Sequence, residues 1–404
     1  MNLERKNDET ENSFIRNNKV MLKNIFGTTN VTPYWVADMD FTIAPQIKKE
    51  LQRLVDRGNF AYEFSSLDVF KAISNWYQRR HQLTLNTDNF VQVTGVLTGI
   101  ALLIRELTKE GDSILIQTPA YHQFSKVIST ANRTIVKNPL KIEDGKYEID
   151  FKDLSKKMSS EKVKAMILCS PHNPVGRVWR KEELEQILLI AKKHNVTIIS
   201  DEIHSDIIYQ GHKFISLMAS GANNHVALIG SPSKTFGMQS ISNGYIYTEN
   251  KTILENMRLQ TESLYLDHGN AFTTFATIAA FEHAEEWLNE FLGYMQGNID
   301  WISQFLMNEL PSIKMFPVEG TYQVWLDFSA TGFEGNELTK IVGEAGFGVS
   351  PGTWFSSNAT QFTRMNFASP REQIKTSFER LKNVLAQSSL PTVVDKKEIP
   401  SSCC

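Results

Sequence analysis

The chain has 404 residues, which is long enough for two or three domains and for a sizeable core. Hydrophobic residues make up 41% of it and charged residues 22%, proportions that exclude a disordered chain, a collagen-like repeat and a coiled coil. With 42 basic and 45 acidic side chains the formal net charge is −3, so the surface offers no overall field for nucleic acid or an anionic membrane.

Short apolar runs alternate with amphipathic stretches between residues 89 and 250. The runs are rich in Val and Ile and lie at 90–93, 113–116, 163–168, 196–199 and 226–229. Apolar side chains recur at helical spacing over 100–107 and 184–191, and His194-Asn195 ends the second of these helices. Alternating strands and helices predict an α/β fold with a mostly parallel sheet, which places ligands at the carboxyl ends of its strands.

The two ends of the chain have different patterns. A long helix is predicted over 283–310, followed by strands at 322–328 and 362–367 and a helix from 371 to 386, which is typical of a smaller α+β domain. The beginning reads as a polar arm with an apolar triplet at 34–36 and a helix after Pro45. The predicted divisions are an arm that is part of the small domain (1–55), a large domain (56–285), a small C-terminal domain (286–387) and a flexible tail (388–404).

Cysteine usage and the chain ends lead us to expect a cytoplasmic protein. Cys169, Cys403 and Cys404 provide neither a disulfide framework nor a Cys-x-x-Cys metal site. The first ten residues are charged, unlike a signal peptide, and no apolar run approaches the roughly 18 residues of a membrane span. No cysteine stands fourth from the end, where a prenylation signal needs one. The nine histidines form no His-Glu-x-x-His or Cys/His cluster, so no metal is expected.

Residues 348–352 match the Gly-x-Ser-x-Gly pattern of serine hydrolases, but we interpret them as a turn-rich loop. The hydrolase motif uses the backbone N–H of the residue after the serine to bind an oxyanion. That residue here is Pro351, which has no N–H. The segment also lies outside the alternation of strands and helices.

Polar residues follow four of the predicted strands. Residues 94–99 form a glycine-bearing turn before a helix, which can hold a phosphate on free backbone N–H groups. Asn173 stands between two prolines in residues 170–176, and Asp201 ends the next strand. Lys234 follows the strand at 226–229 in a Ser-Pro-Ser-Lys segment, where partial desolvation lowers a lysine's pKa and makes the amine nucleophilic.

Each of these features alone is common in turns and loops, but their combination is informative. A phosphate-binding turn, an amide, a carboxylate and a lysine are expected at the same edge of one sheet. Together they supply what pyridoxal 5'-phosphate needs: a lysine for a Schiff base and an acidic partner for the pyridinium nitrogen.

The chain resembles the fold-type I pyridoxal-phosphate enzymes of the class I/II aminotransferase superfamily, from Trp35 to about Leu385. Within that group it looks most like the MalY/PatB-type cystathionine β-lyases, which are carbon–sulfur lyases. The segments that carry the resemblance are residues 35–41 (Trp-Val-Ala-Asp-Met-Asp-Phe), 117–121, 170–176, 201–206 (Asp-Glu-Ile-His-Ser-Asp) and 364–367. The first segment and His204 are specific to the lyase branch, because general aminotransferases usually carry Tyr where His204 stands.

The resemblance implies roles for residues around the cofactor ring. Lys234 would form the Schiff base and act as the general base, and Asp201 would pair with the pyridinium nitrogen. Asn173 would hydrogen-bond the ring hydroxyl, and His204 would lie near it. Tyr121 would stack on the ring and help with proton transfer.

The resemblance also assigns the phosphate and substrate ends of the site. Val96 and Leu97 would donate backbone N–H groups to the phosphate, joined by the hydroxyls of Ser231 and Ser233. Tyr62 matches a tyrosine that reaches the phosphate of the neighbouring subunit, which implies a homodimer. Arg364 would bind the substrate α-carboxylate, and Ala37 would also contact the substrate. Ser242 is a departure, because many members carry Arg there.

These assignments imply α,β-elimination from a small sulfur-containing amino acid, such as cystathionine or a cysteine conjugate, to give a thiol, pyruvate and ammonia. An aminotransferase with the same cofactor is the alternative. A third possibility is a non-catalytic interaction protein on the same scaffold. A pure scaffold has no need to keep Lys234, Asp201, Asn173 and Arg364 together, which weakens that reading.

Overall fold

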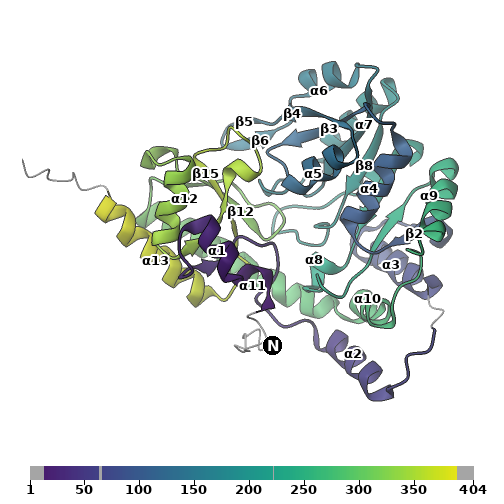
Figure 1. The fold of residues 1–404 in the computed structure, drawn as a ribbon, viewed down its shortest axis with the longest axis horizontal. Coiled ribbons are helices and arrows are strands. Elements are labelled where there is room, and N and C mark those ends of the chain that lie inside the picture. Colours follow the sequence, from purple (N-terminus) through teal and green to yellow (C-terminus); the bar gives the residue numbers. More distant parts are fainter. Residues whose placement is uncertain (1–12, 63–65, 222, 389–404) are drawn as a thin grey trace, which may run out of the picture.

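The computed structural model describes residues 13–62, 66–221 and 223–388, and its centre is a seven-stranded sheet (Figure 1). In spatial order the strands are β2 (Phe90–Val93), β10 (Gly244–Tyr247), β9 (Val226–Gly230), β8 (Thr197–Asp201), β7 (Val163–Cys169), β3 (Ser113–Thr118) and β4 (Thr134–Pro139). Strand β10 is antiparallel to both of its neighbours, and the other adjacent pairs are parallel. The α/β fold with a mostly parallel sheet is therefore confirmed.

Alternation along the buried strands sends side chains into two separate cores. In β7, Ala165 and Ile167 belong to one core, whereas Met166 and Leu168 belong to the other. The first core is completed by α4 (Val96–Leu107), α5 (His122–Thr130) and α9 (Lys251–Ser263). The second is covered by α3 (Ser66–His81), α6 (Phe151–Met158), α7 (Lys181–Lys193) and α10 (Ala271–His283). Both faces are thus covered, as the continuous apolar runs require.

A second, four-stranded sheet lies beside the first in the order β11-β12-β15-β14. Its strands are β11 (Lys314–Met315), β12 (Gln323–Asp327), β15 (Phe362–Asn366) and β14 (Ser350–Pro351), all paired antiparallel. The helices of this part are α11 (Glu285–Glu309), α12 (Gly335–Glu344) and α13 (Arg371–Ser388). The boundaries of the predicted domains themselves stay a prediction.

The beginning of the chain joins this second part. Helix α1 (Lys19–Phe26) packs against α12, and β1 (Thr32–Pro33) pairs with β13 (Phe347–Gly348). The approach is so close that a Cβ atom on Gly343 would lie 2.6 Å from the Phe26 carbonyl oxygen. Helix α2 (Pro45–Arg57) then starts at Pro45, as predicted.

Some predictions of local structure were wrong. The polar arm contains α1, which buries Leu22 and Phe26. Residues 348–352 are not simply a loop, because Gly348 ends β13 and Ser350–Pro351 forms β14. Ser388, the first residue of the predicted tail, is the last residue of α13. The rest of that tail, with Cys403 and Cys404, lies outside the described residues.

Candidate active site

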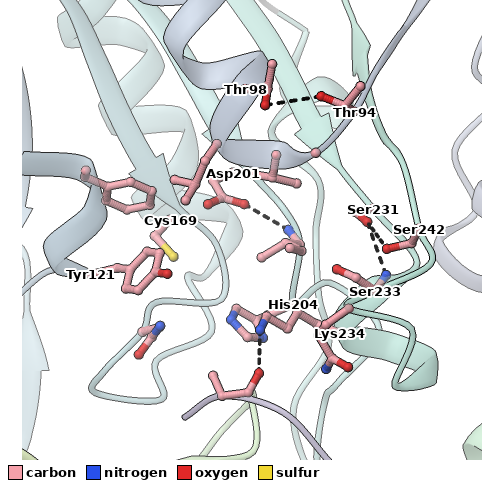
Figure 2. A pocket seen from close by; sticks show the side chains of 18 residues that line it. Thr94, Thr98, Tyr121, Cys169, Asp201, His204, Ser231, Ser233, Lys234 and Ser242 are labelled. Carbon is pink, nitrogen blue, oxygen red and sulfur yellow. Dashed lines mark hydrogen bonds between the residues drawn. The ribbon is translucent and has the colours of Figure 1, made fainter. Parts of the chain in front are cut away.

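A cavity of about 290 Å³ opens at the carboxyl ends of β7, β8 and β9 (Figure 2). Ten of the twelve predicted site residues line it: Ala37, Val96, Leu97, Tyr121, Asn173, Asp201, His204, Ser231, Ser233 and Lys234. Arg364 contacts one of these residues from behind, and Tyr62 lies elsewhere on the surface. The topology therefore brings together residues that are up to 197 positions apart, as in the contact between Ala37 and Lys234.

Lys234 is placed by the short helix α8 (Ser233–Phe236), which follows β9 directly. Its amine donates a hydrogen bond to the carbonyl oxygen of Ala37. Burial lowers the pKa of Lys234 to about 8; the carboxylates of Asp38 and Asp201 oppose this change and Arg364 adds to it. The lowered pKa leaves more of this amine unprotonated near neutral pH than in an ordinary exposed lysine, and the unprotonated form is the nucleophile.

Asp206 fixes the helix that carries Lys234. One carboxylate oxygen accepts a 2.9 Å bond from the hydroxyl of Thr235, the residue after Lys234. The other oxygen is 2.9 Å from both the Trp76 indole nitrogen and the His81 Nε2 atom. Bonds to His81 and Trp76 hold the pKa of Asp206 below its usual value despite its burial. This carboxylate is therefore structural, and it anchors α8 through Thr235.

Asp201, at the end of β8, faces the cavity, and few groups around it offset the negative charge of its carboxylate. Its side chain accepts a 3.1 Å bond from the backbone N–H of Ile203. Burial raises the pKa of Asp201 to about 7, although the Ile203 bond and Lys234 both act against the shift. A buried carboxylate of this kind is suited to a protonated ring nitrogen as its partner.

His204 lies on the wall between Asp201 and Lys234. Burial lowers its pKa to about 3, and the nearby charges of Lys234 and Arg364 act in the same direction. Its Nδ1 atom is buried and has no hydrogen-bond partner among the described residues. The ring is therefore neutral, and the edge of Tyr322 packs on it at a centroid distance of 6.0 Å.

The opposite end of the cavity is built to receive an anion. Helix α4 begins there after Gly95, and no side chain caps its first turn. The first N–H groups of a helix lack partners within the helix and favour an anion. Five hydroxyls surround this turn, those of Thr94, Thr98, Ser231, Ser233 and Ser242 (Figure 2). Lys234 is the only Lys or Arg among the residues that line the cavity.

Arg364, on β15, brings the second sheet to the site. Its guanidinium donates to Asn173 Oδ1 at 3.2 Å, to the Trp35 carbonyl at 2.8 Å and to the Ser350 hydroxyl at 3.3 Å. The cation also lies over the ring of Phe355. Burial lowers the pKa of Arg364 to about 10, which still leaves the group charged at neutral pH. Its Nε atom is buried without a partner among the described residues, so the group retains bonding capacity for a carboxylate.

Several residues of the site were not predicted. They include Thr94, Thr98, Cys169, Gln239 and Ser242, which all line the cavity. Thr94 and Thr98 carried a usable signal, because they belong to the predicted phosphate-binding turn at 94–99, and Ser242 stands where many family members carry an arginine. Gln239 had none, since its position depends on the turn after α8.

Within the described ranges, no group of three or more His, Cys, Asp or Glu side chains is arranged to hold a metal ion. No helix of the same residues is long and apolar enough to cross a membrane.

Comparison with known proteins agrees with this geometry. The family model described as aminotransferase class I and II matches residues 36–381. Cystathionine beta-lyase PatB of Bacillus subtilis (strain 168) is 34% identical over 366 residues, which cover 90% of this chain and 94% of that protein. The PLP-bound putative aminotransferase from Clostridium difficile 630 is 34% identical with a TM-score of 0.91, over 95% of this chain and 99% of that one. Cystalysin from Treponema denticola, whose crystal structure contains pyridoxal 5'-phosphate, is 29% identical with a TM-score of 0.89, over 96% and 99% of the two chains.

Proposed function

The chain belongs to the aminotransferase class I and II family, and on this basis we propose that it is a pyridoxal-phosphate-dependent carbon–sulfur β-lyase. It eliminates the thiol from a sulfur-containing amino acid such as cystathionine, leaving pyruvate and ammonia. The observation that carries the proposal is the convergence of Lys234, Asp201 and the first turn of α4 on one cavity. The relative named a cystathionine beta-lyase supports the choice of reaction.

The residues present fit the cofactor at each of its functional groups. The uncapped turn of α4 and its hydroxyls suit the phosphate, with Val96, Leu97, Ser231 and Ser233 as donors. The buried carboxylate of Asp201 suits a protonated ring nitrogen, because the surrounding residues compensate its negative charge poorly. The orphaned Nδ1 atom of His204 also indicates that a polar group completes this wall.

Lys234, Asp201 and Tyr121 then divide the proton chemistry among them. When bound, the cofactor supplies an electron sink that makes the Cα proton of an amino acid acidic. Lys234 takes that proton at Nζ, because its lowered pKa favours the unprotonated amine that acts as a base. Asp201 holds a proton on the ring nitrogen. Burial raises the pKa of Tyr121, so its hydroxyl stays protonated and is the candidate to donate to the departing sulfur.

Arg364 and Asn173 orient the substrate. The guanidinium is held by Asn173, the Trp35 carbonyl and Ser350, so it is fixed before substrate arrives. A planar cation with spare N–H groups suits the α-carboxylate of an amino acid. Ala37, whose carbonyl already receives Lys234, is placed to contact the same substrate.

The active assembly is proposed to be a homodimer. Tyr62, the residue expected to reach the partner's phosphate, is fully exposed at 107% relative accessibility. Val55, Phe60 and Leu67 around it are also more than half exposed, which is unusual for large apolar side chains so close together in the chain. A two-fold partner would cover this region and bring each Tyr62 to the other subunit's site. A cytoplasmic location stays a prediction.

The proposal is tested by incubating the protein, loaded with pyridoxal 5'-phosphate, with cystathionine. Free thiol and pyruvate are then measured together. Both should form in equal amounts, and the matched Lys234→Ala variant should form neither and should lose the yellow absorbance that borohydride fixes to the chain. Borohydride labelling of a different lysine, or the absence of thiol, would contradict the proposal.

A further inference from the structure

The cavity-lining residue Ala37 lies in a loop that the N-terminal segment holds in place. The loop is residues 35–40, and its Ala37 carbonyl oxygen accepts hydrogen bonds from the Lys234 amine and, at 3.3 Å, from the Tyr322 hydroxyl. No helix or strand contains these residues. The position of this carbonyl therefore depends on what secures the loop from outside.

Arg16 secures the loop through its buried guanidinium. Although it lies in a short turn near the start of the described chain, its side chain is only 5% exposed. The guanidinium Nη1 atom lies 3.1 Å from Asp38, 2.6 Å from Asp40 and 3.2 Å from the Met39 carbonyl oxygen. A single buried cation thus binds two carboxylates and the backbone between them.

The same segment also reaches the other end of the loop. The indole nitrogen of Trp35 donates a 3.1 Å bond to the Arg16 carbonyl oxygen. The carbonyl of Trp35 in turn accepts the 2.8 Å bond from Arg364. Asn366 completes the support by donating to the Val36 and Asp38 carbonyls at 2.6 Å each. Arg16 is therefore linked through Trp35 to Arg364, and it also holds the residues next to Ala37, whose carbonyl binds Lys234.

The charges around Lys234 show what this arrangement changes. The ionisable groups that face its amine are Asp38, Asp201, Arg364, His204 and Tyr322. Among them, Asp38 is the carboxylate that most strongly favours the protonated amine, ahead of Asp201. Because Arg16 binds the same Asp38 carboxylate, part of its negative charge is already neutralised before it acts on Lys234.

We propose that Arg16 is a positioning residue of the site: it holds the 35–40 loop against Lys234 and, by binding the Asp38 carboxylate of that loop, limits how strongly this negative charge favours the protonated amine. The inference rests on the proposed function only in taking Lys234 as the reacting amine. It predicts that removing the charge of Arg16 raises the pKa of Lys234.

The test measures protonation of Lys234 directly, in the full chain freed of cofactor. Each protein is treated with a trace of acetic anhydride at a series of pH values, and acetylation of Lys234 is measured by peptide mass spectrometry. In the unmodified protein the midpoint should lie at about pH 8. Arg16→Gln should move it up by about one unit, and the charge-conserving Arg16→Lys should leave it closer to the original value. Asp38→Asn should move it down.

A purely structural role for Arg16 gives a different result. The thermal unfolding midpoint of Arg16→Gln would then fall while the acetylation midpoint stayed unchanged, and the proposal would be overturned. If Arg16→Gln fails to fold, the Asp38→Asn variant provides the test. An unchanged acetylation midpoint in Asp38→Asn would show that this carboxylate does not influence Lys234, and it would overturn the proposal. None of these measurements depends on cofactor binding or lyase activity. They can therefore be interpreted even if the proposed function is wrong.

Discussion

At the scale of single residues, the site depends on charges that burial has displaced from their usual equilibria. Asp201, Lys234, His204 and Arg364 are all shifted, and burial is the largest cause in each case. Their sequence positions were predictable, since each follows a strand or lies in a recognisable segment. Their electrostatic states were not, because they depend on neighbours such as Asp38 and on how deeply the sheets pack.

The raised pKa of Asp201 predicts a pH-dependent cost to folding without cofactor. A carboxyl group whose pKa rises from 3.8 to about 7 on folding stabilises the folded protein in its protonated form. This stabilisation is complete below about pH 4 and is lost as the pH rises toward 7. Asp201→Asn cannot ionise, so it should become more stable than the unmodified protein over that interval, by roughly 2–4 kcal/mol at pH 8. Urea unfolding at several pH values measures this difference.

The cofactor provides the internal control for that experiment. If pyridoxal 5'-phosphate binds as proposed, its ring nitrogen would give Asp201 a partner, and the advantage of Asp201→Asn should then shrink or reverse. A stability difference that stays constant from pH 4 to 8 would show that Asp201 is not buried as described.

The fixed guanidinium of Arg364 predicts a selective loss of substrate affinity on substitution. Arg364→Lys keeps the charge but loses the planar set of donors that Asn173, Trp35 and Ser350 hold in place. We expect KM for the amino acid to rise about tenfold to a hundredfold, with a much smaller change in the Kd of the cofactor. Arg105→Lys, on the exposed face of α4, is the matched control and should change neither value. An unaltered KM in Arg364→Lys would disprove the assignment.

At the scale of elements, the predictions succeeded where a pattern persists over a whole strand or helix. The runs at 90–93, 113–116 and 163–168 became β2, β3 and β7, because strands covered on both faces must be continuously apolar. Two-residue strands such as β11 and β14 leave no such pattern, since they are defined by their partners β12 and β15. Helix α1 escaped prediction for a related reason: it buries only Leu22 and Phe26.

The start of α4 depends on close packing that a single glycine permits. A Cβ atom on Gly244 of β10 would lie 2.9 Å from the Gly95 carbonyl carbon and 3.0 Å from the Val96 nitrogen. Gly244→Ala should therefore displace the first turn of α4, destabilise the protein by about 1–3 kcal/mol and weaken pyridoxal 5'-phosphate binding about tenfold or more. Calorimetry and a fluorescence titration of the cofactor measure the two effects.

Gly293→Ala is the control for this substitution. Gly293 lies on the exposed side of α11 with no atom within 4 Å of the added Cβ, so the change should be neutral or stabilising by about 0.5–1 kcal/mol. Cofactor affinity in Gly244→Ala equal to that of the Gly293→Ala protein would mean that the turn of α4 does not hold the phosphate.

At the scale of the whole molecule, the proposed dimer is tested by complementation. Tyr62→Phe and Lys234→Ala chains should each be nearly inactive when alone, for different reasons. In a mixed dimer one site combines the intact Lys234 of one chain with the intact Tyr62 of the other, so mixing after dissociation should restore about a quarter of full activity. Activity that stays absent on mixing, or a fully active monomer in sedimentation, would refute the shared site.

The central claim is elimination rather than transamination, and the most direct test is to follow turnover with cystathionine in the absence of any keto acid. A lyase regenerates its cofactor in every cycle, so pyruvate and thiol should accumulate in equal amounts far beyond one equivalent per site. An aminotransferase would instead stop after one equivalent, release no thiol, and resume only when a keto acid is added. Sustained release of pyruvate and thiol is the result that the proposed lyase activity predicts, and a single stalled turnover rescued by keto acid would contradict it.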